Sequence, residues 1–323
     1  MPIVDPHHHL WQFRPEYQVY MLDDLLADYK KGGHNIKATV FTECRTMYSV
    51  DAEEAFKPVG EVEFANGVAA LSASGGLGAL RLCAGIIGYA DLRSPQIRKV
   101  LEAMQARAPE RFRGIRQIAY FHADPAMPQA PQRVPEKLLY DSAFRRGLSH
   151  FEELGLSFDI AVNHTQLQDA IDLADAFPNV TMILNHMGGR LAHGMYADRQ
   201  EEVRETWTRK IFEIAKRPNV VLKIGGIGKK NGGFNFHLRD TPPSSEQLAD
   251  AWRPYFDTCI EAFGPHRAML ESNFPIDKTG CSYAVVWNTF KRLTAALSRD
   301  ERTSLFSECA TQTYRLPIEI LDR

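Results

Sequence analysis

The stretch PIVDPHHHLW at residues 2–11 decides the fold. It opens with a short apolar, β-branched run, as a buried strand does, and it ends in a cluster of histidines. Seven similar short runs follow along the chain, and amphipathic helical patterns separate most of them. This alternation predicts repeated βα units and a parallel sheet.

We predict eight strands, each a short run rich in apolar and β-branched residues. They cover Pro2–Asp5, Ile36–Thr42, Leu82–Tyr89, Phe112–Ile118, Ser157–Val162, Thr181–Asn185, Val220–Ile224 and Ala268–Glu271. The helices expected between them cover Leu22–Lys31, Gln96–Arg107, Asp141–Leu154, Gln166–Ala176, Glu201–Ala215, Ser245–Phe263 and Val285–Ala295. Eight strands alternating with helices in 323 residues predict a (β/α)8 TIM barrel in which residues 1–323 form a single domain.

A doubly wound sheet would also alternate strands and helices. However, no GxGxxG or GxxxxGK[ST] motif follows any of the expected strands, so nucleotide binding lacks its usual sequence support. Within the helix expected at Ser245–Phe263, Pro254 predicts a kink or a break into two helices.

The charge balance argues against several kinds of partner. Lys and Arg total 38 against 40 Asp and Glu, a net charge of −2, which gives no electrostatic reason to expect nucleic acid or an anionic membrane as partner. No uninterrupted apolar stretch is long enough to cross a bilayer, and the first residues lack the pattern of a secretion signal. The five cysteines are scattered and form no CxxC pair, so we expect reduced thiols in a cytoplasmic protein.

The histidine cluster lies where the first strand ends. Residues two apart in a regular strand point to the same side, so Asp5, His7 and His9 are expected to share one side while His8 faces the other. Two imidazoles at this edge could bind a divalent metal or hydrogen-bond a substrate oxygen. An affinity tag or a chance cluster is the alternative, but a tag normally has a longer run and different flanking residues.

Three motifs together resemble a known family. Asp5-x-His7-x-His9 is followed by Leu10-Trp11, Asn185-His186-Met187-Gly188-Gly189 ends a later strand, and Glu271-Ser272-Asn273-Phe274-Pro275 ends the last one. In this order they resemble the amidohydrolase-related proteins, and most of all the branch that contains pyrone-dicarboxylate lactonase and the sugar-lactone hydrolases. The resemblance extends to the segment Cys309–Leu316 and so covers nearly the whole chain.

The resemblance implies a barrel hydrolase that opens a lactone or a similar ester at the carboxyl ends of its strands. It places His7, His9 and His186 at positions that polarise the substrate carbonyl or bind a metal. Some relatives hold zinc there, whereas the pyrone-dicarboxylate lactonase type works without a metal. One divalent metal, zinc or manganese, and metal-free catalysis therefore both stay open. His164 ends the fifth strand, where metal-dependent relatives often place a further ligand, but it could equally be a helix-entry residue.

The last strand departs from the family pattern. Most members have Ser-Asp-Trp-Pro where this chain has Ser272-Asn273-Phe274-Pro275, and an amide cannot accept a proton from water. Either Asn273 only orients substrate or metal while Glu271, Asp277 or a histidine acts as base, or the reaction is not ordinary hydrolysis. Asp277 lies four residues beyond Asn273, so a turn could return its carboxylate to the site, although it could also cap a helix or pair with Lys278.

Other strand ends supply candidate substrate-binding groups. Arg116 ends the fourth strand, where the family places an arginine whose planar fork suits a carboxylate. Glu43 ends the second strand and adds a carboxylate, while Tyr120 and His122 are candidate pocket walls, although aromatic residues after strands are also common packing residues. Lys223 on the seventh strand is more often an exposed or ion-paired lysine than a catalytic one.

We therefore predict an enzyme that opens the lactone ring of a small carboxylated substrate. The alternative within the same superfamily is a metal-dependent decarboxylase of an unsaturated or aromatic acid, which the loss of the usual strand-eight aspartate favours. A third alternative is a barrel retained for ligand binding without catalysis. The oligomeric state, including a homo-oligomer, stays open.

Overall fold

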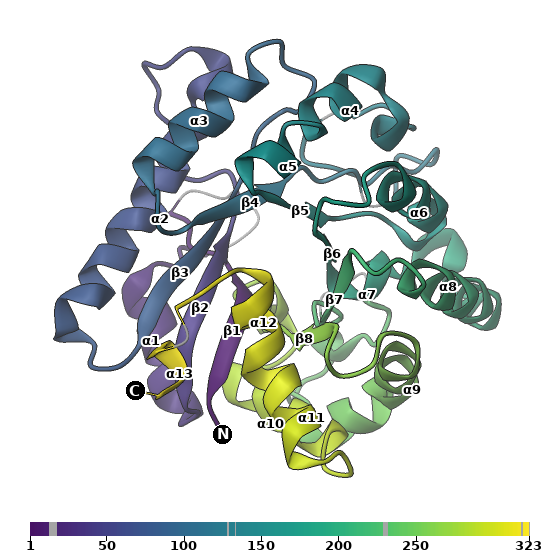
Figure 1. Ribbon diagram of the computed structural model, residues 1–323. Helices are drawn as coiled ribbons and strands as arrows, with labels where there is room; N and C mark the ends of the chain where they lie inside the picture. The colour runs from purple at the N-terminus through teal and green to yellow at the C-terminus, as the bar shows by residue number, and fades with distance from the viewer. Residues whose placement is uncertain (13–17, 128, 133, 229–231, 318, 323) are drawn as a thin grey trace.

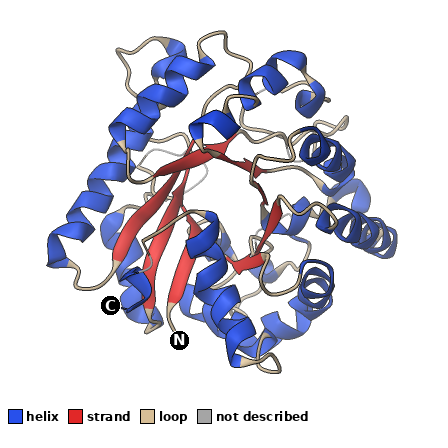
Figure 2. Ribbon diagram, in the orientation of Figure 1, coloured by secondary structure: helices blue, strands red, loops and turns tan. Residues whose placement is uncertain are grey.

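A computed structural model of the protein describes residues 1–12, 18–127, 129–132, 134–228, 232–317 and 319–322. Within this part of the chain, eight parallel strands pair in sequence order from β1 to β8. Figure 1 looks roughly along the axis of the resulting barrel, and Figure 2 shows the ring of strands enclosed by helices. The predicted (β/α)8 fold is confirmed.

The strands lie where the sequence predicts them, with differences at their ends. They are β1 Ile3–His8, β2 Ile36–Thr42, β3 Arg81–Gly88, β4 Phe112–Arg116, β5 Ser157–Ile160, β6 Met182–Leu184, β7 Val220–Ile224 and β8 Ala268–Leu270. The helices are α1 Leu22–Gly32, α2 Val59–Leu71, α3 Ile97–Arg107, α4 Ser142–Leu148, α5 Phe151–Leu154, α6 Leu167–Ala176, α7 His186–Gly189, α8 Gln200–Ala215, α9 Ser245–Phe263, α10 Tyr283–Leu293, α11 Arg299–Thr303, α12 Cys309–Thr313 and α13 Glu319–Asp322.

Three details of the helices differ from the prediction. Helix α2 was missed because its sequence, VGEVEFANGVAAL, is apolar or small on several sides and has no clear polar face. The single helix expected at Asp141–Leu154 is two short ones, α4 and α5. Helix α9 continues through Pro254, so the predicted break into two helices does not occur. Its apolar face stays buried on both sides of the proline, at Trp252 and at Phe256.

The barrel closes between its first and last strands. The Asn273 N–H donates to the His7 carbonyl at 3.0 Å, and the His9 N–H donates to the Phe274 carbonyl at 2.8 Å. These bonds join the β1 end to the segment that follows β8. The histidine cluster and the Ser272–Pro275 motif, distant in sequence, are therefore neighbours.

Asp5 does not share a side with His7 and His9, so that prediction was wrong. Its carboxylate accepts hydrogen bonds from the Ser272 hydroxyl at 2.5 Å and from the Tyr283 hydroxyl at 3.1 Å, and Tyr283 belongs to the outer helix α10. The pairing register of β1 with β2 shifts between Asp5 and His8, which breaks the simple alternation of sides. Asp5 therefore fastens the closure of the barrel from outside.

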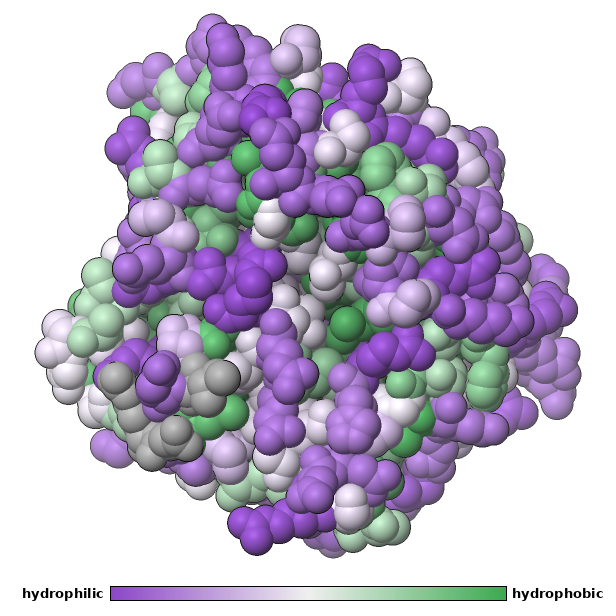
Figure 3. All heavy atoms as spheres, in the orientation of Figure 1, coloured by the Kyte–Doolittle hydropathy of each residue, from purple (hydrophilic) through white to green (hydrophobic). Residues whose placement is uncertain are grey.

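One end of the barrel is filled by apolar side chains. A cluster that includes Val4, Val40, Ile183 and Met269 packs against Cys309, Ala310 and Tyr314 from α12 and the residue that follows it. Figure 3, in the orientation of Figure 1, shows a surface that is mostly hydrophilic with small separate apolar patches. Polar side chains gather instead at the other, carboxyl ends of the strands, where active sites of this fold lie.

None of the helices in the described ranges combines the length and apolar character needed to cross a membrane.

Two glycines give a matched test of the packing. A Cβ on Gly114 of β4 would lie 2.2 Å from the Ser157 carbonyl oxygen on β5, whereas a Cβ on the helical Gly67 of α2 would meet nothing within 4 Å. We expect Gly114→Ala to lower the free energy of unfolding by about 1–3 kcal/mol through overpacking. Gly67→Ala should raise it by about 0.5–1 kcal/mol, because alanine loses less backbone entropy in a helix. Urea denaturation measures both, and equal effects of the two substitutions would contradict the close approach of β4 and β5.

Candidate active site

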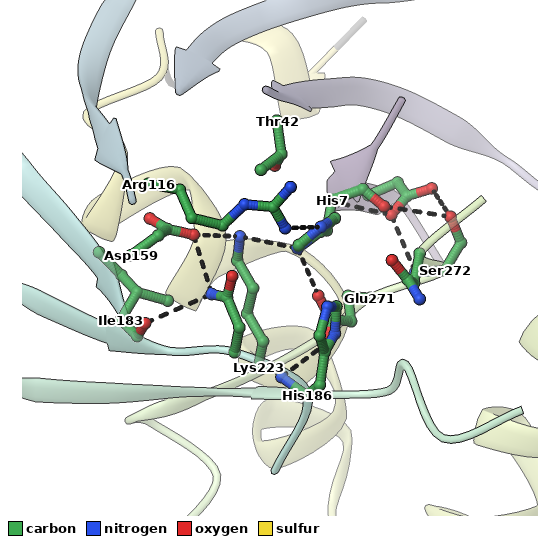
Figure 4. Close-up of polar contacts among 12 residues, drawn as sticks. His7, Thr42, Arg116, Asp159, Ile183, His186, Lys223, Glu271 and Ser272 are labelled. Carbon is green, nitrogen blue, oxygen red and sulfur yellow. Dashed lines mark hydrogen bonds and ion pairs between the residues drawn. The ribbon is translucent and has the colours of Figure 1, made fainter. Parts of the chain in front are cut away.

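The carboxyl ends of the strands bring together a buried polar cluster (Figure 4). His7 lies near the end of β1, His9 directly follows that strand, and His186 opens α7 after β6. Glu271 follows β8 directly, and its side chain is fully buried. Residues from opposite ends of the sequence thus meet in a single cluster.

Glu271 joins two of the three imidazoles. Its Oε1 lies 2.6 Å from His186 Nδ1, and its Oε2 lies 2.8 Å from His7 Nδ1. Because a carboxylate accepts hydrogen bonds, the proton of neutral His186 sits on Nδ1 and its lone pair on Nε2. This arrangement gives His186 the orientation and tautomer of a general base.

His7 is held between anionic and cationic groups. Arg116 Nη1 lies 3.1 Å from His7 Nε2, and because a guanidinium only donates, that nitrogen accepts the hydrogen bond. The Lys223 ammonium lies 3.3 Å from His7 Nδ1. Burial, then Lys223 and His186, hold the pKa of His7 well below its usual value. His7 is therefore neutral at physiological pH.

His9 is oriented by the main chain of β2. Its Nδ1 lies 2.8 Å from the Thr42 carbonyl oxygen, which can only accept, so Nδ1 carries the proton and Nε2 the lone pair. The His9 ring lies edge-on to the His7 ring, with 4.9 Å between their centroids. His9 thus adds a second nitrogen with a fixed lone pair.

Arg116 links the end of β4 to the end of β2. Its Nε donates to Glu43 Oε1 at 2.8 Å, and its Nη2 donates to the Glu43 carbonyl at 2.6 Å. Burial lowers the pKa of Arg116, but Glu43 and Tyr120 raise it, and the net shift is upward. Together with the bond to His7, these contacts use three of the five N–H groups of the Arg116 guanidinium, counting partners in the described part of the chain.

A second polar network supports His7 from the interior of the barrel. Lys223 Nζ donates to Asp159 Oδ2 at 2.7 Å, and both side chains are fully buried. Asp159 also accepts from Asn185 Nδ2 at 2.9 Å and from the Tyr314 hydroxyl at 3.2 Å. Lys223 is therefore ion-paired, as expected, while the roles of Asp159 and Tyr314 were missed because strand position alone does not show which buried polar residues meet.

Asn273 and Asp277 form a pair beside this cluster. Asn273 Nδ2 donates to Asp277 Oδ1 at 2.7 Å, and Asp277 Oδ2 accepts from the Gly228 N–H at 3.0 Å. The turn after β8 brings the Asp277 carboxylate to the Asn273 side chain, and both residues are buried. The pair ties the end of β8 to the loop that follows β7.

The remaining candidates lie on loops after β4, β5 and β6. His122 Nδ1 accepts from the Asp124 N–H at 3.0 Å, so its Nε2 donates to the Tyr196 hydroxyl at 3.0 Å. His164 is buried with its ring 5.3 Å from that of Tyr196, and burial, then Arg190, lowers the pKa of His164 to about 4. Tyr196 was not singled out from the sequence, because no motif surrounds it.

Two glycines after β7 leave room for the side chains of Glu271 and His186. A Cβ on Gly226 would lie 2.1 Å from His186 Nδ1, and a Cβ on Gly225 would lie 2.5 Å from Glu271 Cγ. Gly226 also has a φ of +64°, which other residues rarely adopt. Both glycines are needed for the Glu271–His186 contact.

The side chains of this cluster suit a divalent metal of the zinc type. Ligand atoms of His7, His186 and Glu271 lie within 4.8 Å of one another. Among the described residues, these three form the group of His, Cys, Asp or Glu side chains that could hold a metal ion. His9 offers a further imidazole nitrogen fixed by a main-chain carbonyl, the outer support that metal-binding histidines usually have. The donor set therefore fits such an ion.

The fold and site define an amidohydrolase-type barrel, and the sequence agrees. The family model described as amidohydrolase matches residues 4–316, so the chain belongs to this family. It is 32% identical to the uncharacterized protein y4mH of Sinorhizobium fredii, over 97% of this chain and 98% of the relative. It is 26% identical to an L-fucono-1,5-lactonase of Burkholderia multivorans, over 72% of each chain.

Solved structures share the fold at lower sequence identity. An amidohydrolase of Burkholderia multivorans with bound zinc is 21% identical, with a TM-score of 0.76 over 98% of this chain and 100% of the other. A putative 2-pyrone-4,6-dicarboxylic acid hydrolase of Pseudomonas putida has a TM-score of 0.64 at 14% identity over 98% of each chain. The 5-carboxyvanillate decarboxylase LigW of Sphingomonas paucimobilis has a TM-score of 0.58 at 13% identity over 98% of this chain and 99% of the other. The fold is thus shared by proteins named for different reactions.

Gly226 allows a sharp test of the site. We expect Gly226→Ala to lower turnover at least about 100-fold, because the new methyl group would displace His186 from Glu271 and misplace a reacting group. Gly264→Ala is the matched control, since Gly264 has a similar φ of +69° but open space around it. Steady-state kinetics and thermal melting of both variants measure the effect. Equal losses of activity in the two would show that backbone strain, rather than the His186 contact, is responsible.

Proposed function

We propose that this protein hydrolyses the ring ester of a small carboxylated lactone at the carboxyl ends of its barrel strands. The observation that carries the proposal is the Glu271–His186 hydrogen bond, which supplies a base despite the amide at position 273. The family membership and the lactonase relative support it.

The proposed step uses His186 as general base. Nε2 takes a proton from water as the water oxygen bonds to the carbonyl carbon, while Glu271 stabilises the imidazolium through Nδ1. The ring C–O bond then breaks, and His186 returns the proton to the leaving alkoxide. The product is the open-chain hydroxy acid.

Polarisation of the carbonyl and binding of the substrate are assigned to the neighbouring groups. We assign polarisation to the Arg116 guanidinium, whose cation lies beside the imidazole of His7. The two remaining N–H groups of Arg116 suit a substrate carboxylate, and we assign Tyr120, His122 and Glu43 to the surrounding pocket. Asn273 and Asp277 act as an orienting pair in this scheme.

The site includes side chains that could bind a divalent metal. His7, His186 and Glu271 are the residues that would hold zinc or manganese, with His9 and His164 as the further ligands proposed from the sequence. When bound, the ion would supply Lewis-acid polarisation of the carbonyl. Metal content of tag-free protein, measured by mass spectrometry beside activity after chelation, decides this point. About one ion per chain with chelator-sensitive turnover supports the metal form, while no stoichiometric ion with chelator-resistant turnover supports polarisation by side chains alone.

The proposed base makes a specific prediction. We expect His186→Ala and Glu271→Gln each to lower kcat for lactone opening by about 10²–10⁴-fold, the usual contribution of a general base. Acid release from a lactone panel, followed with a pH indicator, measures the effect. Glu246→Gln, a change of the same type at an exposed position paired with Arg292, is the control and should leave kcat unchanged. Full activity in His186→Ala would remove His186 from the reaction.

A decarboxylase is the second candidate, favoured by the amide at Asn273, whose Nδ2 is engaged by Asp277. The same samples distinguish the two reactions. A lactonase releases acid and consumes the ester, whereas a decarboxylase releases carbon dioxide and bleaches the ultraviolet absorbance of a conjugated acid. A protein that shifts its melting temperature with a ligand but turns over neither substrate class would be a binding protein.

A further inference from the structure

The segment Thr42–Thr46, which follows β2, contacts the active site at several points. The Thr42 carbonyl orients His9, and Glu43 binds Arg116 through both its side chain and its main-chain carbonyl. The Cys44 thiol donates to the Leu10 carbonyl, next to His9. A shift of this segment would therefore move the orientation of His9 and Arg116 together.

Glu61 of α2 holds this segment from outside the barrel. Its Oε1 accepts from the N–H groups of Cys44 and Thr46, both at 2.9 Å. The side chain is fully buried, and within the described residues Oε2 has no hydrogen-bond partner. Arg45, which lies between the two bonded N–H groups, has a φ of +64°. Such a backbone conformation is unfavourable for a residue other than glycine and persists only when neighbouring groups hold it.

We propose that Glu61 is a positioning residue of the active site, which holds the Thr42–Thr46 segment through its two N–H groups and thereby sets the Glu43–Arg116 pair. It does not touch the reacting atoms and acts through the loop. The proposal rests on the proposed hydrolase function only for its kinetic readout.

The surroundings of Glu61 favour the neutral carboxyl. Burial and the nearby Glu43 raise the pKa of Glu61 to about 8, against the lowering effect of the two N–H donors and of Arg116. Tyr48 faces it from the same loop, Tyr89 stands near Glu43 at the end of β3, and Arg107 of α3 is paired with Glu63 on the exposed side of α2. Above this pKa the protein would carry a second carboxylate charge close to Glu43, competing for Arg116.

The test uses Glu61→Gln, Glu61→Ala and the control Glu63→Gln on the same helix. Glutamine retains the accepting oxygen and cannot ionise, so it should stay within about twofold of wild-type kcat at pH 7, whereas alanine should lose at least about tenfold. The ratio of Glu61→Gln to wild-type kcat, corrected for spontaneous lactone opening, should rise about fivefold or more from pH 7 to pH 9.5. The Glu63→Gln ratio should stay flat. Equal losses in the glutamine and alanine variants, or a flat Glu61→Gln ratio, would overturn the proposal.

Hydrogen exchange, which needs no substrate, tests the positioning role of Glu61 independently of the proposed lactone hydrolysis. Hydrogen exchange of peptides covering residues 43–48 should be at least about tenfold faster in Glu61→Ala and near wild type in Glu61→Gln. Unchanged exchange in Glu61→Ala would overturn the positioning role even if the wild type opens lactones. Faster exchange confined to Glu61→Ala, in a protein that opens no lactone, would support the positioning role while the proposed reaction fails.

Discussion

The site depends on a single buried carboxylate. Glu271 hydrogen-bonds His186 through Oε1 and lies against the His7 imidazole through Oε2, and a carboxylate that has lost its water is stable only when polar partners surround it. This requirement explains the small residues at Gly225 and Gly226, since side chains there would occupy the space of Glu271 and His186. It also explains why β1 and β8 must close the barrel, because the His7–Glu271 contact spans that closure.

Charge balance governs the interior around this carboxylate. Glu43 and Asp159 accompany the cations Arg116 and Lys223, and these pairs lie on either side of neutral His7. Removing one member of a buried pair costs far more than the pair itself contributes, because the remaining charge is left uncompensated. The network thus constrains the site to keep its charged residues as a set, and it limits which single substitutions the barrel tolerates.

The sequence predicted the fold and much of the candidate site, for clear physical reasons. The strands are short apolar, β-branched runs, and His7, His9, Arg116 and His186 lie at or just beyond their ends, where the fold places active sites. Asp5 was placed wrongly because a register shift leaves no signal in residue type. Glu61 was missed because α2 lacks an amphipathic pattern. Tyr314 and Asp159 meet only through tertiary packing, which periodicity does not report.

The Tyr314 hydroxyl has a consequence for how the protein is made. It donates to Asp159, which in turn holds Lys223 beside His7, and Tyr314 follows all eight strands in the sequence. During synthesis the barrel strands emerge first, so the polar centre lacks this support until the segment around α12 has left the ribosome and packed into the end of the barrel. The polar cluster at the strand ends is therefore complete only after this segment has packed against the barrel.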